Sequence, residues 1–467
     1  MRKEKHANIM FLRAYNAGIT AKSLLTAFAA SLAMSERLKN KPLYKVFMGL
    51  STDILLWVLY FVALYFSIFI LTIFVFESEK THKKPHTCPL VSIIIPAWNE
   101  EKSIRETVES TLHLNYPQDK LQIIAVNHGS DDKTGKILDS IKGIEVLHIT
   151  RKKGDNKAVA FNKGLARAEG KFVACLDADS VVSAEALNDM LPYFAESEKV
   201  AVVTPSMLIK SPKNLLQWLQ KYEYIVSLFV KRLSSHINCI YVAPGPFSLY
   251  RTSILKELGG FDEKAIAEDM EIVYRLQKNQ YIAKQCLKGG YSYVAAPNTI
   301  KELYKQRQRW YGGSLSNIYQ YRKLAFNRRY GDFGFFQMPK NLMGVVTVFT
   351  TLALFAYFAL WPLARKAYYF FVIRFEIMPY LLNPNINLNI FTLKNVQGAF
   401  VVLILMIISL IFFICACRMA NEKMQKATIP VLLVFFTVYP LMLCVMYLMV
   451  AFKKMLRQDF VWDKMAR

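Results

Sequence analysis

The chain has 467 residues, of which 54% are hydrophobic and 20% charged, and its mean hydropathy is +0.21. A positive mean hydropathy is unusual for a purely soluble protein, so membrane-spanning segments are expected. The same composition excludes disordered, collagen-like and disulfide-scaffold proteins. The 59 Lys and Arg outnumber the 35 Asp and Glu, and this net charge of +24 suits nucleic acid, anionic lipid or an anionic substrate.

Four uncharged apolar runs are long enough to cross a bilayer, whose hydrocarbon core of about 30 Å needs about 20 helical residues. These predicted transmembrane helices are residues 54–76, 341–364, 398–417 and 429–452. The basic N-terminal segment, residues 1–53, can lie at the membrane surface. Residues 325–340 mix aromatic and basic side chains, which predicts an interfacial helix, and residues 453–467 form a tail.

The positive-inside rule, by which basic residues beside membrane spans lie on the cytoplasmic side, conflicts with these spans. If the region between the first two spans is cytoplasmic, both the basic N-terminus and Lys453, Lys454 and Arg457 lie outside. Either a second membrane passage lies within residues 7–34, or the rule is overridden here. The sequence leaves both alternatives open.

Residues 86–324 alternate short apolar runs with amphipathic runs. Runs rich in Val and Ile predict strands at residues 90–95, 122–126, 145–149, 172–176 and 200–204. Amphipathic runs predict helices at residues 103–114, 134–141, 157–168 and 184–194. This alternation predicts a parallel sheet with helices on both faces, and ligands bind such sheets beyond the carboxyl ends of the strands.

Three motifs follow predicted strands: PAWNEE at 96–101, VNHGSDD at 126–132 and DADS at 177–180. The first is an ordinary turn by itself, and Asp131 and Asp132 of the second can cap the next helix. In the third, Asp177 and Asp179 could converge on one Mg²⁺ or Mn²⁺, because hard cations take oxygen ligands and share them with phosphates. A solvated aspartate turn is the alternative.

Two further motifs lie nearer the second apolar run. In AED at 267–269, Asp269 could be a general base, because an aspartate of ordinary pKa, about 3.9, is ionised at neutral pH. An acidic helix start, favoured by the helix dipole, is the alternative. In QRQRW at 306–310, Arg309 could bind phosphate oxygens and Trp310 could stack on a sugar ring. A basic juxtamembrane helix that binds anionic lipid is the alternative there.

In this order, and with a GPFSLYR loop at 245–251, the motifs resemble processive family 2 glycosyltransferases. These membrane polysaccharide synthases make cellulose, hyaluronan, chitin or poly-N-acetylglucosamine. No single motif is specific, but the ordered set of DxD, ED and QxxRW is. Residues 153–170 also resemble the family's lysine-containing helix beside the nucleotide. The resemblance implies an α/β fold: a Rossmann-like nucleotide-diphospho-sugar transferase domain with a mostly parallel sheet, embedded between transmembrane helices.

The resemblance also implies roles for individual residues. The nucleotide-sugar would be bound by Ala97, Glu100, His128, Lys157, Asp177, Asp179 and Arg309. Asp177 and Asp179 would hold Mg²⁺ or Mn²⁺, and Asp269 would be the catalytic base. The acceptor would be bound by Phe247, Gln306 and Trp310. His128 departs from the family, which usually has an aspartate there that meets the uracil edge; a histidine can also donate, so base preference and activity stay open.

The implied function is inverting, metal-dependent transfer from a UDP-sugar into a β-linked polysaccharide that is passed across the membrane. UDP-N-acetylglucosamine is the favoured donor, because residues 125–134 and 461–467 resemble that branch. The implied partners are the UDP-sugar donor, a growing glycan or lipid acceptor, membrane lipid and a small accessory membrane subunit. Nucleic acid is not expected, since no binding module is recognised. The implied location is the cell (inner or plasma) membrane, with several spans and a cytoplasmic catalytic domain.

Three other functions share some of these sequence features. Transfer of a single sugar to a polyprenyl phosphate shares the sheet and DADS, and stays open. A degenerate, non-catalytic scaffold that binds a nucleotide-sugar is supported only by His128. A glycoside hydrolase also uses two carboxylates, but it does not need a metal-type DxD beside a nucleotide-binding sheet.

Overall fold

The computed structural model describes residues 42–76, 88–209, 211–287, 289–356, 360–372, 396–422 and 428–456. The chain divides into two compact units, Met1–Ala63 and Leu64–Arg467, and the boundary in sequence falls within helix α3 (Pro42–Phe76). The predicted N-terminal segment lies outside the described residues as far as residue 41, and the predicted tail lies outside them from residue 457.

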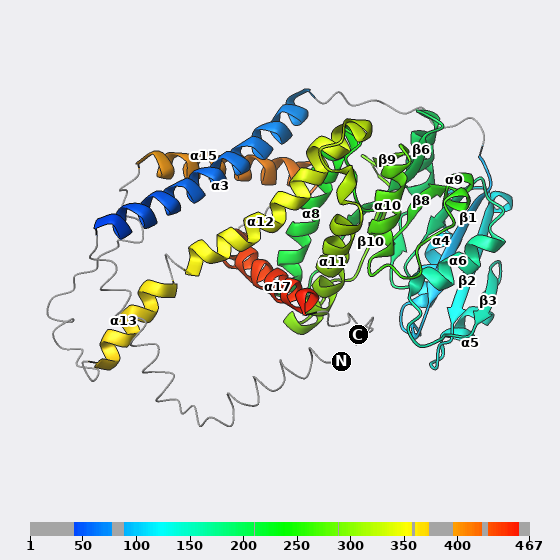
Figure 1. Ribbon diagram of the computed structural model, residues 1–467. Coiled ribbons are helices and arrows are strands. Elements are labelled where there is room, and N and C mark those ends of the chain that lie inside the picture. Colours follow the sequence, from blue (N-terminus) through cyan, green and yellow to red (C-terminus); the bar gives the residue numbers. More distant parts are fainter. Residues whose placement is uncertain are drawn as a thin grey trace, which may run out of the picture. The chain divides into compact units, whose positions relative to one another are not determined.

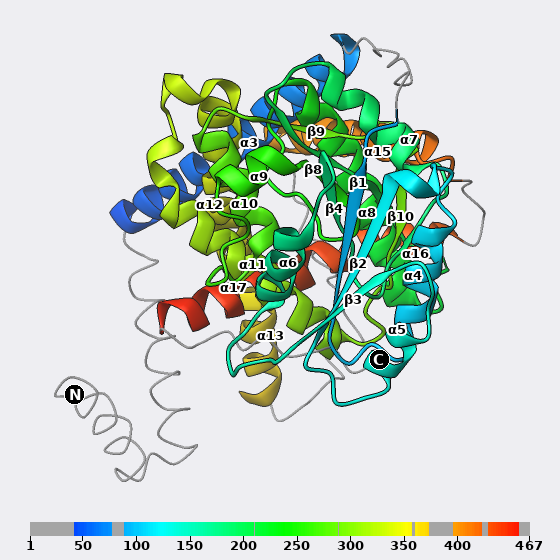
Figure 2. The same ribbon diagram turned by 90° about the vertical axis from the view of Figure 1, so that its right-hand side faces the viewer.

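A seven-stranded sheet forms the centre of the second unit, in the order β3-β2-β1-β4-β8-β6-β9 (Figures 1 and 2). Its strands are β1 (Val91–Ala97), β2 (Leu121–His128), β3 (Glu145–Ile149), β4 (Phe172–Cys175), β6 (Val200–Thr204), β8 (Ser248–Arg251) and β9 (Ile282–Gln285). Only β8 runs antiparallel to its neighbours, β4 and β6. The predicted α/β fold with a mostly parallel sheet is therefore confirmed. A small sheet has the order β5 (Val181–Val182), β10 (Tyr291–Tyr293) and β7 (Ser206–Leu208).

The period-two pattern of the strands places their apolar side chains on both faces of the sheet. In β1, Ile93 and Ile95 belong to one buried cluster, whereas Ile94 belongs to the other. The helices on the first face are α4 (Ile104–Leu112), α5 (Thr134–Asp139) and α7 (Ala186–Met190), which the 3-10 helix η2 (Leu191–Ala195) follows. Those on the second face are α6 (Lys157–Arg167), α9 (Thr252–Glu257) and α10 (Glu268–Lys278).

The five predicted strands and the helices predicted at 103–114, 134–141 and 157–168 all occur in the structure. The region predicted as one helix at 184–194 is divided between α7 and η2. The expectation of a loop throughout 245–251 was wrong, because residues 248–251 form β8. This strand has four residues, all buried between two neighbours, so no alternating pattern reveals it.

Two long helices extend beyond the sheet. In α8 (Leu215–His236), the Asn214 side chain accepts a hydrogen bond from the backbone N–H of Gln217 at 2.9 Å and caps the first turn. Thr299 caps α11 (Ile300–Gln320) in the same way. Figure 1 shows α8 and α11 between the sheet and helices α12 (Met338–Phe355) and α17 (Val438–Met455).

Within the part of the chain that the structure describes, three helical segments are long and apolar enough to cross a membrane: Leu56–Phe76, Phe333–Phe355 and Ile429–Met455. The second joins the π-helical turn η5 (Phe333–Gln337) directly to α12, and the third joins α16 (Ile429–Phe436) to α17. Helix α15 (Val396–Met419) includes a shorter apolar stretch, Leu403–Met419, and α13 (Trp361–Val372) precedes it in the chain. Apolar helices thus flank the α/β domain in sequence on both sides.

Candidate active site

The carboxyl ends of β1 and β2 bring the first two motifs together. Ala97 ends β1 and pairs in register with Asn127, the residue before His128. Beyond the strands, the backbone N–H of Asp131 donates to Asn99 Oδ1 at 2.8 Å, which joins the two loops. The structure therefore places Ala97 and His128 at the same edge of the sheet.

Glu100 lies in the loop just before α4. Its carboxylate accepts a hydrogen bond from Ser103 Oγ at 2.9 Å, and its backbone N–H donates to Thr134 Oγ1 at 2.7 Å. These bonds tie the start of α4 to the start of α5. A contact of Glu100 with a nucleotide stays a prediction.

His128 contacts a carboxylate that the sequence analysis did not select. Its Nε2 lies 3.3 Å from Asp155 Oδ2, and its side chain is 3% exposed. Burial lowers the pKa of His128, so the ring is neutral at pH 7, and the geometry assigns the proton to Nε2. The backbone N–H of Lys152 also donates to Asp155 Oδ2, and this bond is the main reason that the pKa of Asp155 is low.

Trp98 and Arg151 form a second contact at this edge, because the Arg151 guanidinium lies 3.6 Å from the centre of the Trp98 ring. Such stacking is typical of a cation–π interaction. Sequence reasoning missed both residues. The aromatic side chain inside PAWNEE is the signal that could have found Trp98.

Lys157 and Asp177 form an ion pair across the site. Burial favours a neutral amine, but the charges of Asp177 and Glu268 outweigh it and raise the pKa of Lys157. Gly245 lies against this pair: a Cβ there would be 2.5 Å from Lys157 Nζ and 2.7 Å from Asp177 Oδ1. Only glycine leaves the pair undisturbed at that position.

Asp177 and Asp179 follow β4, and the buried Ala178 lies between them. Within the part of the chain that the structure describes, no group of three or more His, Cys, Asp or Glu side chains could hold a metal ion. A Mg²⁺ or Mn²⁺ ion that shares its ligands with phosphates needs only one or two protein carboxylates. The DADS carboxylates therefore fit the predicted metal.

Asp269 lies in the first turn of α10, and its carbonyl oxygen accepts a hydrogen bond from the backbone N–H of Ala243 at 3.0 Å. Burial and then the neighbouring Glu268 raise the pKa of Asp269 to about 6, while Arg309 and Lys157 oppose the shift. The expectation of an ordinary pKa was therefore wrong, because the carboxylate is partly removed from water. It remains mostly ionised at pH 7 and is a stronger base than an exposed aspartate.

Helices α10 and α11 approach closely at Gly313. A Cβ on Gly313 would lie 2.4 Å from the Cβ of Ala267, the residue before α10. This contact between backbones allows the QRQRW strip, one turn earlier on α11, to reach the acidic first turn of α10.

Four neighbouring carboxylates act on the charge of Arg309. Burial would lower the pKa of Arg309, but four neighbouring carboxylates raise it. They are Glu268, Asp269, Asp177 and Asp179. The structure thus brings the DADS, AED and QRQRW motifs together, although they span about 130 positions of the chain.

The rest of QRQRW faces α8. The buried Arg307 forms an ion pair with Glu223 at 2.7 Å, and its guanidinium lies 4.4 Å from the centre of the Trp310 ring. The Trp310 ring is also 6.4 Å from that of Tyr224. Gln306 Oε1 is buried and has no hydrogen-bond partner among the described residues, so it can accept from a bound hydroxyl.

Phe247 differs from the other predicted site residues. Its backbone has a φ of +71°, and its N–H donates to the carbonyl oxygen of Cys175 at 2.7 Å. Its side chain is wholly buried in the core cluster that contains Ile93. This conformation does not present the ring to an acceptor, and that role stays a prediction.

Comparison with known proteins supports the family that the sequence motifs resemble. Residues 92–259 match the model of glycosyl transferase family 2. The chain is 32% identical over 225 residues to the poly-beta-1,6-N-acetyl-D-glucosamine synthase of Staphylococcus epidermidis, which is 48% of this chain and 54% of that protein. The chain thus spans about half the length of that synthase.

A second relative covers more. The chain is 31% identical over 315 residues to the probable glycosyltransferase YdaM of Bacillus subtilis, which is 62% of this chain and 73% of that protein. Among solved structures, the mannosyltransferase PcManGT from Pyrobaculum calidifontis, in complex with GDP-Man and Mn²⁺, has a TM-score of 0.56 at 15% identity. That likeness covers 87% of this chain and 98% of the mannosyltransferase, and it shows a shared fold. The chain belongs to glycosyl transferase family 2, with relatives of the poly-N-acetylglucosamine synthase type.

Proposed function

We propose that the protein is an inverting, metal-dependent transferase that extends a β-linked polysaccharide from a UDP-sugar. One observation carries this proposal: Asp269, with a pKa of about 6, shares its surroundings with Arg309 and the Lys157–Asp177 pair. The base can take the proton of an acceptor hydroxyl. The two cations can stabilise the negative charge of a diphosphate leaving group. The relatives named poly-beta-1,6-N-acetyl-D-glucosamine synthase support UDP-N-acetylglucosamine as the donor.

The nucleotide end of the donor would lie across the ends of β1 and β2. There Ala97 and Glu100 would border the nucleotide, and His128 offers a neutral ring fixed by its hydrogen bond to Asp155. Asp155, rather than residue 128, supplies the carboxylate at this position. Base recognition by this carboxylate accounts for a histidine where the family usually has an aspartate.

The diphosphate would lie between Lys157 and Arg309. Both side chains keep their charge, because the surrounding carboxylates raise their pKa values. Preorganised cations of this kind stabilise charge that grows on a leaving group, by several kcal/mol in typical sites. A Mg²⁺ or Mn²⁺ ion held by Asp177 and Asp179 would act as a Lewis acid and stabilise the negative charge on the diphosphate oxygens.

Transfer would proceed by a single displacement. Asp269 takes the proton of the acceptor hydroxyl, whose oxygen forms a bond to the anomeric carbon while the bond from that carbon to the diphosphate oxygen breaks. Attack from the opposite face inverts the configuration, so an α-linked donor gives a β-linked product. The ionised fraction of Asp269 at pH 7 and its partial burial both suit this step.

The acceptor end would lie along α11. The unpartnered Gln306 Oε1 can accept a hydrogen bond from a sugar hydroxyl, and the Trp310 ring offers a flat apolar face for the sugar. The apolar segments Phe333–Phe355 and Ile429–Met455 follow this helix in sequence. They support a multi-pass membrane protein. In this proposal the catalytic domain would be cytoplasmic, and the glycan would cross the membrane from it.

The test uses the full chain purified in lipid, with Mn²⁺ or Mg²⁺ and a panel of UDP-sugars. Release of UDP identifies the donor, and the length of the labelled product identifies the reaction. A ladder of β-linked oligomers is expected. A single lipid-soluble monosaccharide adduct would instead indicate transfer to a polyprenyl phosphate, and donor binding without UDP release would indicate a non-catalytic scaffold.

A further inference from the structure

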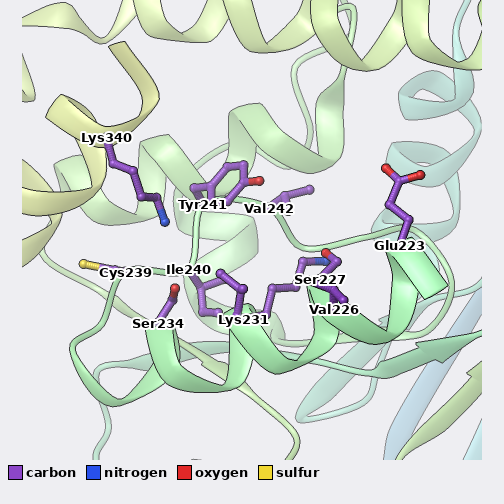
Figure 3. A pocket seen from close by; sticks show the side chains of 11 residues that line it. Glu223, Val226, Ser227, Lys231, Ser234, Cys239, Ile240, Tyr241, Val242 and Lys340 are labelled. Carbon is purple, nitrogen blue, oxygen red and sulfur yellow. The ribbon is translucent and has the colours of Figure 1, made fainter. Parts of the chain in front are cut away.

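A cavity with a mostly apolar lining and a few polar groups lies between α8 and the start of α12, and it shares Glu223 with the surroundings of Arg307. It has a volume of about 250 Å³, and none of the predicted site residues lines it. Lys231 on α8 and Lys340 on α12 both line it. Figure 3 shows the Lys340 side chain reaching from α12 toward α8. A space of this size suits a small headgroup rather than a complete nucleotide-sugar.

The charges that line this cavity are unbalanced. Among the described residues, neither Lys231 nor Lys340 forms an ion pair with a carboxylate, although the Lys340 amine lies 5.3 Å from the centre of the Phe336 ring. The carboxylate in the lining belongs to Glu223, which already accepts from Arg307 at 2.7 Å and from the Tyr439 hydroxyl at 2.5 Å. Two amines therefore line the cavity without an ion-pair partner among the described residues, and Asp269 acts on Lys231 only from a longer distance.

Removing an amine from water without a counter-charge is unfavourable, and Lys231 shows this effect. Burial lowers the pKa of Lys231 to about 8, and the negative field of Asp269 only partly opposes the shift. The amine is still mostly protonated at pH 7. A bound anion would relieve this cost.

The other polar groups of the lining favour an anion with several oxygens. The hydroxyl groups of Ser227, Ser234 and Tyr241 border the same space and can donate hydrogen bonds. Lysine binds phosphate as a point charge, and basic pockets beside membrane helices bind lipid headgroups. The apolar segment Phe333–Phe355 carries Lys340 itself, so the cavity lies where such a helix begins.

We propose that the cavity between α8 and α12 binds a phosphoryl group through the amines of Lys231 and Lys340. The group comes either from an anionic membrane lipid or from free phosphate. This inference does not rest on the proposed transferase reaction, because binding here needs neither a donor nor Asp269. The two can therefore fail separately.

The test places the full chain in phosphatidylcholine nanodiscs without any UDP-sugar. One arm adds phosphatidylglycerol to the bilayer, and the other adds inorganic phosphate to the buffer. Lysine acetylation rates are followed residue by residue by mass spectrometry, and the thermal midpoint is recorded. Lys323, an exposed lysine on the 3-10 helix η3 (Arg322–Leu324), is the internal control.

Acetylation of Lys231 and Lys340 should slow by about tenfold when the site is saturated, while the rate at Lys323 stays unchanged. The accompanying rise in the thermal midpoint should be lost in K231Q/K340Q and kept in K323Q. Protection by phosphatidylglycerol alone assigns a lipid headgroup, and protection by inorganic phosphate assigns the free ion. The proposal is overturned if neither probe changes the acetylation rates, or if the midpoint of K231Q/K340Q rises as much as that of the parent.

Discussion

Replacing Asp269 by asparagine should separate catalysis from stability. The substitution removes the base, so transfer should fall by about 10²–10⁴-fold, the usual contribution of general base catalysis. It also removes a carboxylate whose charged form is disfavoured by burial and by Glu268. We therefore expect Asp269→Asn to be more stable than the parent protein at pH 8, although it transfers sugar far more slowly.

The size of this stabilisation follows from the pKa shift. A rise from 3.8 to about 6 is roughly two units, and each unit corresponds to about 1.36 kcal/mol, so the upper bound is about 3 kcal/mol. The folded-state pKa is raised, so the cost of the charge is absent below pH 3.8. It accumulates as the pH rises to about 6 and is constant above that value. The advantage of Asp269→Asn should therefore shrink by roughly half at pH 5.

The assay compares thermal midpoints of the two proteins in the same lipid at pH 5 and pH 8, together with UDP release. Asp119→Asn is the matched control, because Asp119 has a 76% exposed side chain on the 3-10 helix η1 (Gln118–Lys120). It should change neither quantity. A lower midpoint for Asp269→Asn at pH 8, or a gap that does not narrow at pH 5, would refute the burial argument. Transfer at the parent rate would refute the role of the base.

Three further outcomes are expected. Gly313→Ala should lower both the transfer rate and the thermal midpoint, because the new Cβ would lie 2.4 Å from that of Ala267. Alanine has the better helix propensity, so a raised midpoint would contradict the close contact. His128→Asn should keep the affinity for UDP measured by calorimetry, whereas His128→Asp should weaken it, because a second carboxylate would lie beside Asp155. Equal affinities of the two variants would argue against recognition of the base by Asp155. A chelator should abolish transfer and Mn²⁺ should restore it, and Asp179→Asn should need about tenfold more Mn²⁺ for half-maximal rate; an unchanged requirement would remove Asp179 from the metal site.

The sequence predicted the sheet edge well because its signals are local. Runs of Val and Ile mark β1, β2 and β4, and the polar motifs follow those strands directly. Parallel strands then bring their carboxyl ends to one edge whatever the loops do. The meeting of DADS with AED and QRQRW was predicted from the resemblance alone, and no spacing argument produces it.

Other features depend on contacts between distant segments. The ion pair of Arg307 with Glu223 joins residues 84 positions apart, and neither local sequence is unusual. The same holds for Asp155, which reaches His128 from the loop before α6. The raised pKa of Asp269 depends on burial, which follows from tertiary packing rather than from its own neighbours in sequence.

The contacts of Glu223 connect the proposed acceptor end of the site to an apolar helix. Its carboxylate accepts from Arg307, whose guanidinium lies over Trp310, and from the hydroxyl of Tyr439 on α17. A buried ion pair adds little net stability, because desolvation offsets most of its attraction, so its main effect is to fix orientation. One carboxylate therefore contacts both the Arg307–Trp310 stack and α17. A shift of α17 would change the hydrogen bonds of Glu223 and, through Arg307, the support of the Trp310 ring. Helix α17 also contacts α11 directly, where the Tyr311 and Tyr447 rings lie 4.9 Å apart. The proposed sugar binding at Trp310 would therefore be coupled to the position of this apolar helix.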